Sequence, residues 1–167
     1  MEEIVNRVAQ SPLITIDLEE LRPSGERHIV DLSVWLEKGF ILREKEFRQA
    51  LTEHDWTLYQ SAYVAVQCSS KAVLPAWAAL LVATYLSIAK VVVWGDEMDL
   101  EKALYTHSIA AMDISTYAEK PLIIKGCSDP SVPQSAYLDL IRKLQPVAKS
   151  IFFGEACSSV PLFKAKK

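Results

Sequence analysis

Several residue patterns that mark common enzyme classes are missing from this chain of 167 residues. Its five glycines form no G-x-G-x-x-G or Walker loop, and neither H-E-x-x-H nor G-x-S-x-G occurs, so nucleotide, zinc-peptidase and esterase chemistry gain no support. Only eight prolines accompany those glycines, and 50% of the residues are hydrophobic, which excludes disordered, collagen-like and low-complexity classes. We expect a globular protein, and the sequence leaves open whether it is an enzyme.

An excess of charge of one sign is also missing. The 18 Lys+Arg and 21 Asp+Glu residues give a net charge of -3 and no long basic stripe, so we expect no binding to nucleic acid. Three cysteines, an odd number without close spacing, fit a reducing compartment. Together with an N-terminus that does not resemble a secretory leader, they predict a cytoplasmic location.

One uncharged run, Ala72 to Ala89, approaches the length of a membrane span. It is rich in alanine, contains Pro75, Thr84 and Ser87, and leads directly into a β-rich segment. We therefore predict a buried helix here and no membrane association.

An internal repeat organises the chain beyond residue 40. A shift of 59 positions aligns Cys68-Ser69 with Cys127-Ser128 and Gly95-Asp96 with Gly154-Glu155, and upstream of them the shift is 58. One extra residue near Gly126 in the second copy explains the change. Both copies therefore have the same predicted order of helix, strand, helix and strand.

The predicted fold class is α/β, with a mainly parallel sheet covered by helices and built from two similar α-β-α-β units. Helices are predicted over 43–51, 72–88, 99–111 and 133–147, and strands over 63–66, 91–94, 122–124 and 151–153. Continuous apolar strands that alternate with helices imply right-handed crossovers in a parallel sheet.

A single domain is expected over residues 1–167, because this length suffices for one core. It would comprise an N-terminal extension (1–40), a first repeat unit (41–98), and a second repeat unit with a C-terminal Cys-Ser segment (99–167). The extension contains a predicted strand over Leu13–Ile16, and residues 31–36 fit either a strand or a short helix.

A thiol cluster is the leading functional hypothesis. Cys68 and Cys127 each follow the first strand of a repeat, and Cys157 follows the last predicted strand, so all three are expected at the carboxyl edge of one sheet. Three thiolates suit zinc or an iron–sulfur cluster. The additional ligands considered at this edge are Asp96, Glu155 and His54.

Two alternatives stay open. In the first, the cysteines are packing residues, the serines that follow them are helix N-caps, and the protein is a non-catalytic binding or assembly module. The uncharged helix 72–88 and the tryptophans would then serve a homodimer or a protein partner. In the second alternative, one activated cysteine performs thiol redox chemistry.

Five short motifs resemble the signature of a known family. They are Gly25-Glu26-Arg27, Arg43-Glu44-Lys45-x-Phe47-Arg48, His54-Asp55-Trp56, Gly126-Cys127-Ser128-x-x-x-Val132-Pro133 and Gly154-Glu155-x-Cys157-Ser158-x-Val160-Pro161-Leu162-x-Lys164. The chain looks like a member of the bacterial family catalogued as domain of unknown function 2480, although Ala156 replaces an expected proline. The resemblance implies a small cytoplasmic protein without an established activity, and an association with iron–sulfur assembly. It transfers no catalytic residue.

Overall fold

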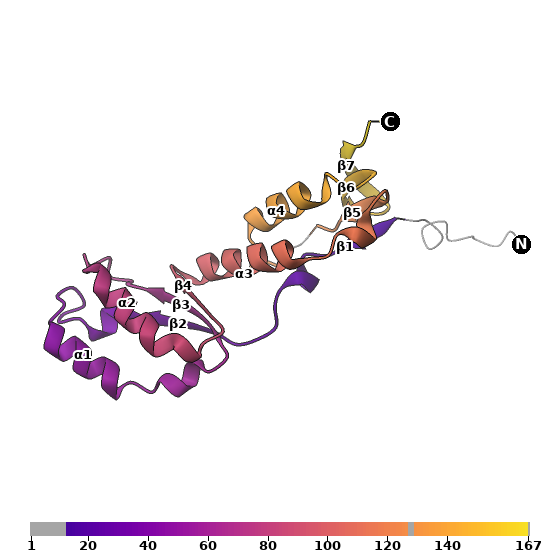
Figure 1. Cartoon of the computed structure of the whole chain (residues 1–167). Helices are drawn as coiled ribbons and strands as arrows, with labels where there is room; N and C mark the ends of the chain where they lie inside the picture. The colour runs from indigo at the N-terminus through magenta and orange to yellow at the C-terminus, as the bar shows by residue number, and fades with distance from the viewer. Residues whose placement is uncertain (1–12, 127–128, 167) are drawn as a thin grey trace, which may run out of the picture. The chain divides into compact units, whose positions relative to one another are not determined.

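Strands alternate with helices in the computed structural model, which describes residues 13–126 and 129–166 (Figure 1). The strands are β1 (Ile14–Ile16), β2 (Arg27–Asp31), β3 (Tyr63–Gln67), β4 (Val91–Trp94), β5 (Pro121–Ile124), β6 (Ser150–Glu155) and β7 (Ser158–Lys164). The helices are α1 (Glu44–Glu53), α2 (Ala76–Tyr85), α3 (Glu97–Ala111) and α4 (Gln134–Leu144). Short 3-10 helices are η1 (Glu19–Leu21), η2 (Leu32–Trp35), η3 (Trp56–Tyr59), η4 (Leu86–Ile88) and η5 (Ser115–Tyr117). The predicted α/β class is confirmed.

The strands form two sheets, whereas the sequence suggested one. Among the described residues, a three-stranded sheet has the order β2-β3-β4, and a four-stranded sheet has the order β1-β5-β6-β7. The chain divides accordingly into unit 2, Ser24–Ala103, and unit 1, which combines Met1–Pro23 with Leu104–Lys167. The division falls inside α3, and unit 1 takes its first strand from the N-terminal side of unit 2.

In unit 2, β2, β3 and β4 are parallel, and α1 and α2 pack on the same face of their sheet (Figure 1). Right-handed crossovers between strands in sequential order place successive helices on one face. Phe47 and Leu51 of α1 and Val82 of α2 are fully buried against Val64 of β3. This core is therefore complete within residues 24–103.

In unit 1, α3 and α4 pack on one face of the four-stranded sheet. Tyr105 of α3 and Leu140 of α4 are fully buried with Leu122 of β5 and Ile151 of β6. Three strands are parallel, and β7 returns antiparallel to β6 through a tight turn. The sequence did not predict β7, because most of its side chains are exposed and no buried face marks it as a strand.

The predicted pair of α-β-α-β units is confirmed. A shift of 58 carries β3 onto β5, and a shift of 59 carries β4 onto β6 and α2 onto α4. The residues before position 40 extend this similarity, because an Asp-Leu pair, Asp17-Leu18 or Asp31-Leu32, stands where each of β1 and β2 gives way to a short 3-10 helix. Leu18 and Leu32 are both fully buried. Each unit is thus a β-α-β-α-β module, and residues 31–36 form η2 after the end of β2.

The uncharged run 72–89 forms only α2 and η4, and it is not fully buried. Ala78 and Val82 face the core, while Leu80 is 67% exposed and Val73 is 98% exposed. No helix in the described part of the chain is both long and apolar enough to cross a bilayer.

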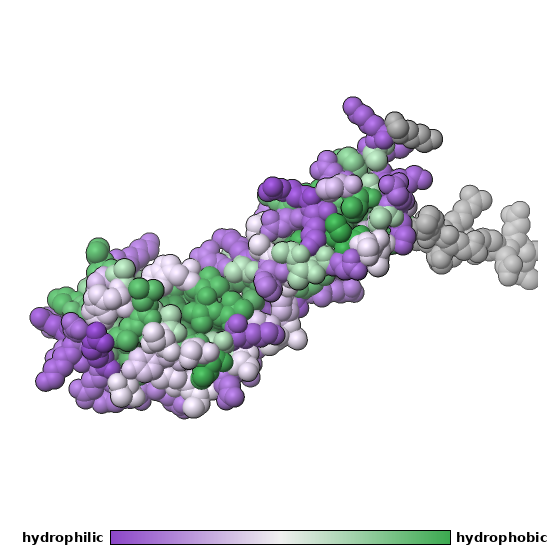
Figure 2. Space-filling view, viewed as in Figure 1, coloured by the Kyte–Doolittle hydropathy of each residue, from purple (hydrophilic) through white to green (hydrophobic). Residues whose placement is uncertain are grey.

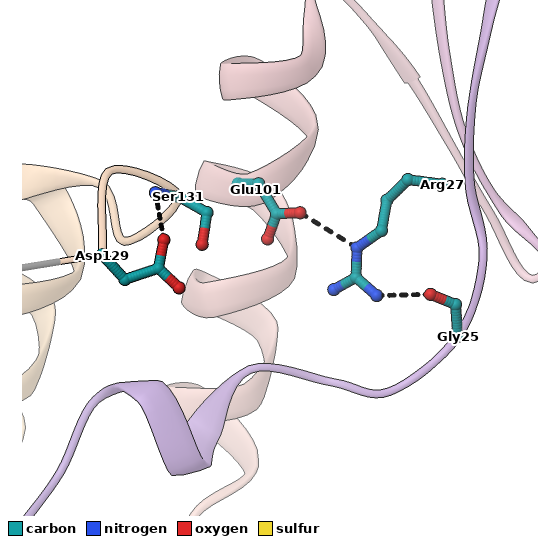
Figure 3. Close-up of polar contacts among 5 residues, drawn as sticks. All are labelled: Gly25, Arg27, Glu101, Asp129 and Ser131. Carbon is teal, nitrogen blue, oxygen red and sulfur yellow. Dashed lines mark hydrogen bonds and ion pairs between the residues drawn. The ribbon is translucent and has the colours of Figure 1, made fainter.

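One of the ion pairs within unit 2 has a buried carboxylate. Arg27 Nε donates to Glu101 Oε1 at 2.9 Å, and the same guanidinium donates to the carbonyl oxygen of Gly25 at 2.6 Å (Figure 3). Glu101 is 1% exposed and is the one buried charged side chain in the region described. A buried carboxylate is costly unless it is paired, so this pair fixes the start of β2 against the first turns of α3.

Removing the buried carboxylate should be much more damaging than removing an exposed one. Glu101→Ala leaves the Arg27 guanidinium without its buried partner, and we expect the free energy of unfolding to fall by about 3 kcal/mol. Glu44→Ala breaks an exposed pair with Arg48 on α1 and should cost about 0.5 kcal/mol or less. Urea denaturation measures both, and equal losses would contradict the assignment.

Candidate functional site

The carboxyl edge of the unit 2 sheet is held by hydrogen bonds among its own polar groups. Asp31 Oδ1 accepts from the backbone N–H of Ser33 and of Ser69, both at 3.0 Å, and the two serine hydroxyls lie 3.1 Å apart. Burial raises the pKa of the Asp31 carboxyl, but the hydrogen bonds from Ser69 and Ser33 outweigh it and hold that pKa below its ordinary value. The carboxylate is therefore engaged in joining two loops.

The predicted metal or iron–sulfur centre is wrong. Cys68 is half-buried after β3 in the three-stranded sheet, whereas Cys157 is exposed in the turn between β6 and β7 of the four-stranded sheet. Cys127 lies outside the described residues. Within those residues no three His, Cys, Asp or Glu side chains gather as a metal site would require. The prediction failed because it assumed one shared sheet edge, and the strands before Cys68 and Cys157 belong to different sheets.

Asp96, one of the three proposed additional ligands, has a local structural role. Asp96 Oδ1 accepts from the N–H of Asp99 at 2.9 Å, and Asp99 Oδ2 accepts from the N–H of Asp96 at 3.3 Å, a reciprocal cap at the start of α3. Gly95 precedes this cap at φ +143°, where a Cβ would collide with Asp99. Glu155, another of the proposed additional ligands, is exposed at the end of β6.

His54 ends α1 and belongs to an aromatic cluster. Its Nε2 is hydrogen-bonded to the Tyr59 hydroxyl at 2.9 Å, and its ring lies 4.7 Å from the Trp56 ring. Trp56 Nε1 donates to the carbonyl of Leu51, and Asp55 Oδ1 accepts from the N–H of Thr57. The His54-Asp55-Trp56 motif thus joins the end of α1 to η3, which is a structural role.

The carboxyl edge of the unit 1 sheet is similar. Lys125 Nζ donates to Asp17 Oδ2 at 2.7 Å, immediately after β5 and β1, and this bond holds the pKa of Asp17 below its ordinary value of 3.8. Asp129 Oδ1 accepts from the N–H of Ser131 at 2.8 Å, as Figure 3 shows. The polar residues at both edges therefore act mainly as loop caps, and thiol redox chemistry stays a prediction that these contacts do not favour.

An apolar groove runs beside α4 in unit 1. It has a volume of about 560 Å³ and is lined by Ile124, Gln134, Tyr137, Leu138, Ile141, Gln145, Phe153, Leu162 and Phe163. Leu138 and Leu162 are 60% and 51% exposed, so these large side chains lie open to solvent. The groove is the concave apolar surface on which a binding role is best based.

A β-bulge shapes the β7 side of this groove. Phe163 pairs with Ile151 and Pro161 with Phe152, which leaves Leu162 as the extra residue. A bulge re-aims a side chain, and here two consecutive apolar residues, Leu162 and Phe163, line the same groove. The groove was not predicted, because the last predicted strand ends at residue 153 and β7 was not expected. The apolar run Val160-Pro161-Leu162-Phe163 was the signal in the sequence that could have indicated it.

The fold and these sites define a protein of two α/β modules with mainly parallel strands. In the described residues no set of catalytic side chains is brought together. The chain belongs to the family described as "Protein of unknown function (DUF2480)", whose family model matches residues 2–165. The resemblance that the motifs indicated is confirmed. Comparison with curated proteins and with solved structures found no match.

The Asp17–Lys125 pair predicts a specific pH dependence of stability. Because the folded-state pKa of Asp17 is lowered, the pair stabilises the fold above about pH 4 and loses this contribution as the pH falls through the lowered pKa. Lys125→Met should therefore lower the urea midpoint at neutral pH and weaken its decline on acidification.

Lys120→Met is the matched control for this prediction. Lys120 Nζ donates to the carbonyl of Thr116 and contacts no carboxylate through a hydrogen bond in the described structure, so its removal should leave the acid dependence unchanged. Urea midpoints from neutral pH down to about pH 3 test both variants. An unchanged acid dependence in Lys125→Met would refute the role of the pair.

Proposed function

We propose that this protein is a non-catalytic binding module whose unit 1 groove takes an amphipathic helix of a partner protein. The observation that supports this most directly is the exposed apolar lining of the groove, formed by one side of α4 and by β7. Amphipathic helices bind such grooves through apolar residues at positions i, i+3, i+4 and i+7.

The architecture of unit 1 favours a helix as the occupant. α4 connects β5 to β6, and β7 adds a fourth strand without a following helix in the described residues. Sheets in α/β folds normally have helices side by side on each covered face. The helix of the partner would therefore lie beside α4 and over β7, where a further crossover helix would lie.

Charge near one end of the groove narrows the chemistry of the partner. Arg142 of α4 borders a smaller hollow that shares Gln145 and Phe163 with the groove. Lys164 follows Phe163 in the chain at the same end. These cations favour a helix with acidic residues beside its apolar face.

A cytoplasmic location is part of this proposal. An odd number of cysteines without close spacing suits a reducing compartment. The net charge of -3 likewise favours a protein partner over nucleic acid.

A labelled peptide tests the proposed groove without knowledge of the natural partner. The probe is a designed helix with leucine at i, i+3, i+4 and i+7 and glutamate elsewhere on its flanks. Fluorescence anisotropy should show saturable binding to the full chain. Leu138→Glu and Leu162→Glu should each weaken this binding by about tenfold or more, which is about 1.4 kcal/mol per factor of ten.

Three controls make the experiment decisive. A peptide of the same composition in scrambled order should not bind, and one with lysine in place of glutamate should bind more weakly. Leu80→Glu places the same change on an exposed leucine of α2 in unit 2 and should leave peptide affinity unchanged. Equal binding of the ordered and scrambled peptides, or equal effects of Leu138→Glu and Leu80→Glu, would refute the proposal.

A further inference from the structure

The edge strands of the two sheets differ in how they are protected. Exposed edge strands are usually short, or carry proline or charged residues, because their free N–H and C=O groups could otherwise pair with another chain. β1 has only three residues, β2 carries Arg27, His28 and Asp31, and β7 carries Pro161 and Lys164. β4 alone among these four described edges is entirely apolar, with the sequence Val-Val-Val-Trp. Its Trp94 is 58% exposed and its Val92 is 37% exposed.

The residues around β4 are complementary to themselves in the antiparallel direction. Consider two copies of the strand related by a two-fold axis at Val93. Val92 of each copy then lies opposite Trp94 of the other, which is a favourable pair of a β-branched and an aromatic residue. In the same register Lys90, which precedes β4, and Asp96, which follows Gly95 and caps α3, lie just beyond opposite ends of the paired strands, so the axis brings Lys90 of each copy toward Asp96 of the other. A register centred on any other residue loses this charge match.

The position of α2 fits the same arrangement. α2 connects β3 to β4 and packs against Val64 and Val66 of β3, and the axis would lie just beyond β4. A crossover helix centred over the two strands that it connects would lie about 10 Å from its copy in the joined sheet, because neighbouring strands are about 4.8 Å apart. This is the ordinary distance between packed helices, so the joined sheet would bring the two helices into contact without a gap.

The side of α2 that would meet its copy is apolar and small. Trp77 contacts Phe47 of α1, and Tyr85 stacks on Trp56, so that side of α2 faces α1. The side turned away from α1 and toward the free edge carries Ala76, Ala79 and Ala83, and the exposed Leu80 lies next to them. Figure 2 shows apolar residues gathered over α2 in this unit. Small side chains allow two helices to approach closely.

We infer that unit 2 is the interface of a homodimer, in which β4 pairs antiparallel with β4 of a second copy and α2 packs against α2. The three sheet strands of each copy then form one continuous sheet of about six strands. The edge without blunting residues, the matched charges of Lys90 and Asp96, and the uncharged flank of α2 are all explained by this one contact. The interface uses no residue of the unit 1 groove, so it stands independently of the proposed function.

Sedimentation equilibrium of the full chain across a dilution series tests the dimer. We expect a mass of twice the 18.7 kDa of one chain at the higher concentrations. Ala83→Glu and Trp94→Lys place charge at the helix contact and at the strand edge, and each should raise the dissociation constant by about tenfold or more. Thr84→Glu, one residue along α2 and turned toward the opposite flank, and Leu138→Glu in unit 1 are matched controls that should leave it unchanged.

A cross-link tests the register without added charge. In a chain whose three cysteines are replaced by serine, Val93→Cys should form a disulfide between copies on mild oxidation, because residues directly opposite in a non-hydrogen-bonded antiparallel pair have Cα atoms about 4.5 Å apart. Val91→Cys lies on the same face of β4, but in this register it faces Gly95 and should cross-link far less. Far-UV circular dichroism confirms that each variant is folded.

Two results would overturn the inference. One is a monomer at every concentration. The other is a dimer that meets through another surface. Such a dimer would stay intact in Ala83→Glu and Trp94→Lys, or Val93→Cys would cross-link no better in it than Val91→Cys.

Discussion

The parallel pairing of β1 with β5 is the contact on which the organisation of the chain depends. Only three residue pairs form it, from Ile14 with Leu122 to Ile16 with Ile124, and they join segments that are separated by all of unit 2. The Asp17–Lys125 ion pair and a hydrogen bond from Lys125 N–H to the Ile16 carbonyl extend the contact past the strand ends. Because β1 pairs with β5, the sheet that contains β5 and β6 begins with a strand other than β2. The two modules therefore form separate sheets and separate cores.

Local sequence patterns predicted most helices and strands, because the apolar periodicity that marks each of them lies within a few neighbouring residues. The apolar run at Val91–Trp94 and the amphipathic α4 are found where periodicity placed them, and the repeat gave the correct correspondence between modules. The pairing of β1 across a whole module leaves no local signal, so the thiols were assigned to one sheet edge. The similarity of Ile16-Asp17-Leu18 to Val30-Asp31-Leu32 was the available clue that β1 and β2 begin different modules. β7 was missed because its exposed residues show no buried face.

The separation of the sheets also changes where function is expected. At the two carboxyl edges Asp31 joins two loops through hydrogen bonds and Asp17 forms an ion pair with Lys125. Large apolar side chains are instead exposed at two places, which are the groove beside α4, where Leu138 and Leu162 lie, and the edge strand β4, where Val92 and Trp94 lie. Exposed apolar surface of this kind is typical of interaction sites. These exposed surfaces are the observations that support the proposed binding role and the inferred dimer.

Backbone NOEs in the isotopically labelled full chain test the central claim, which is the interleaving of the two modules. The pairing of β1 with β5 predicts contacts from Thr15 to Ile123, the pairing of β2 with β3 predicts contacts from Ile29 to Ala65, and no strand pairing is expected between β4 and β5. Contacts from residues 14–16 to the β2-β3-β4 sheet, or between β4 and β5, would contradict this account and return the strands to a single sheet.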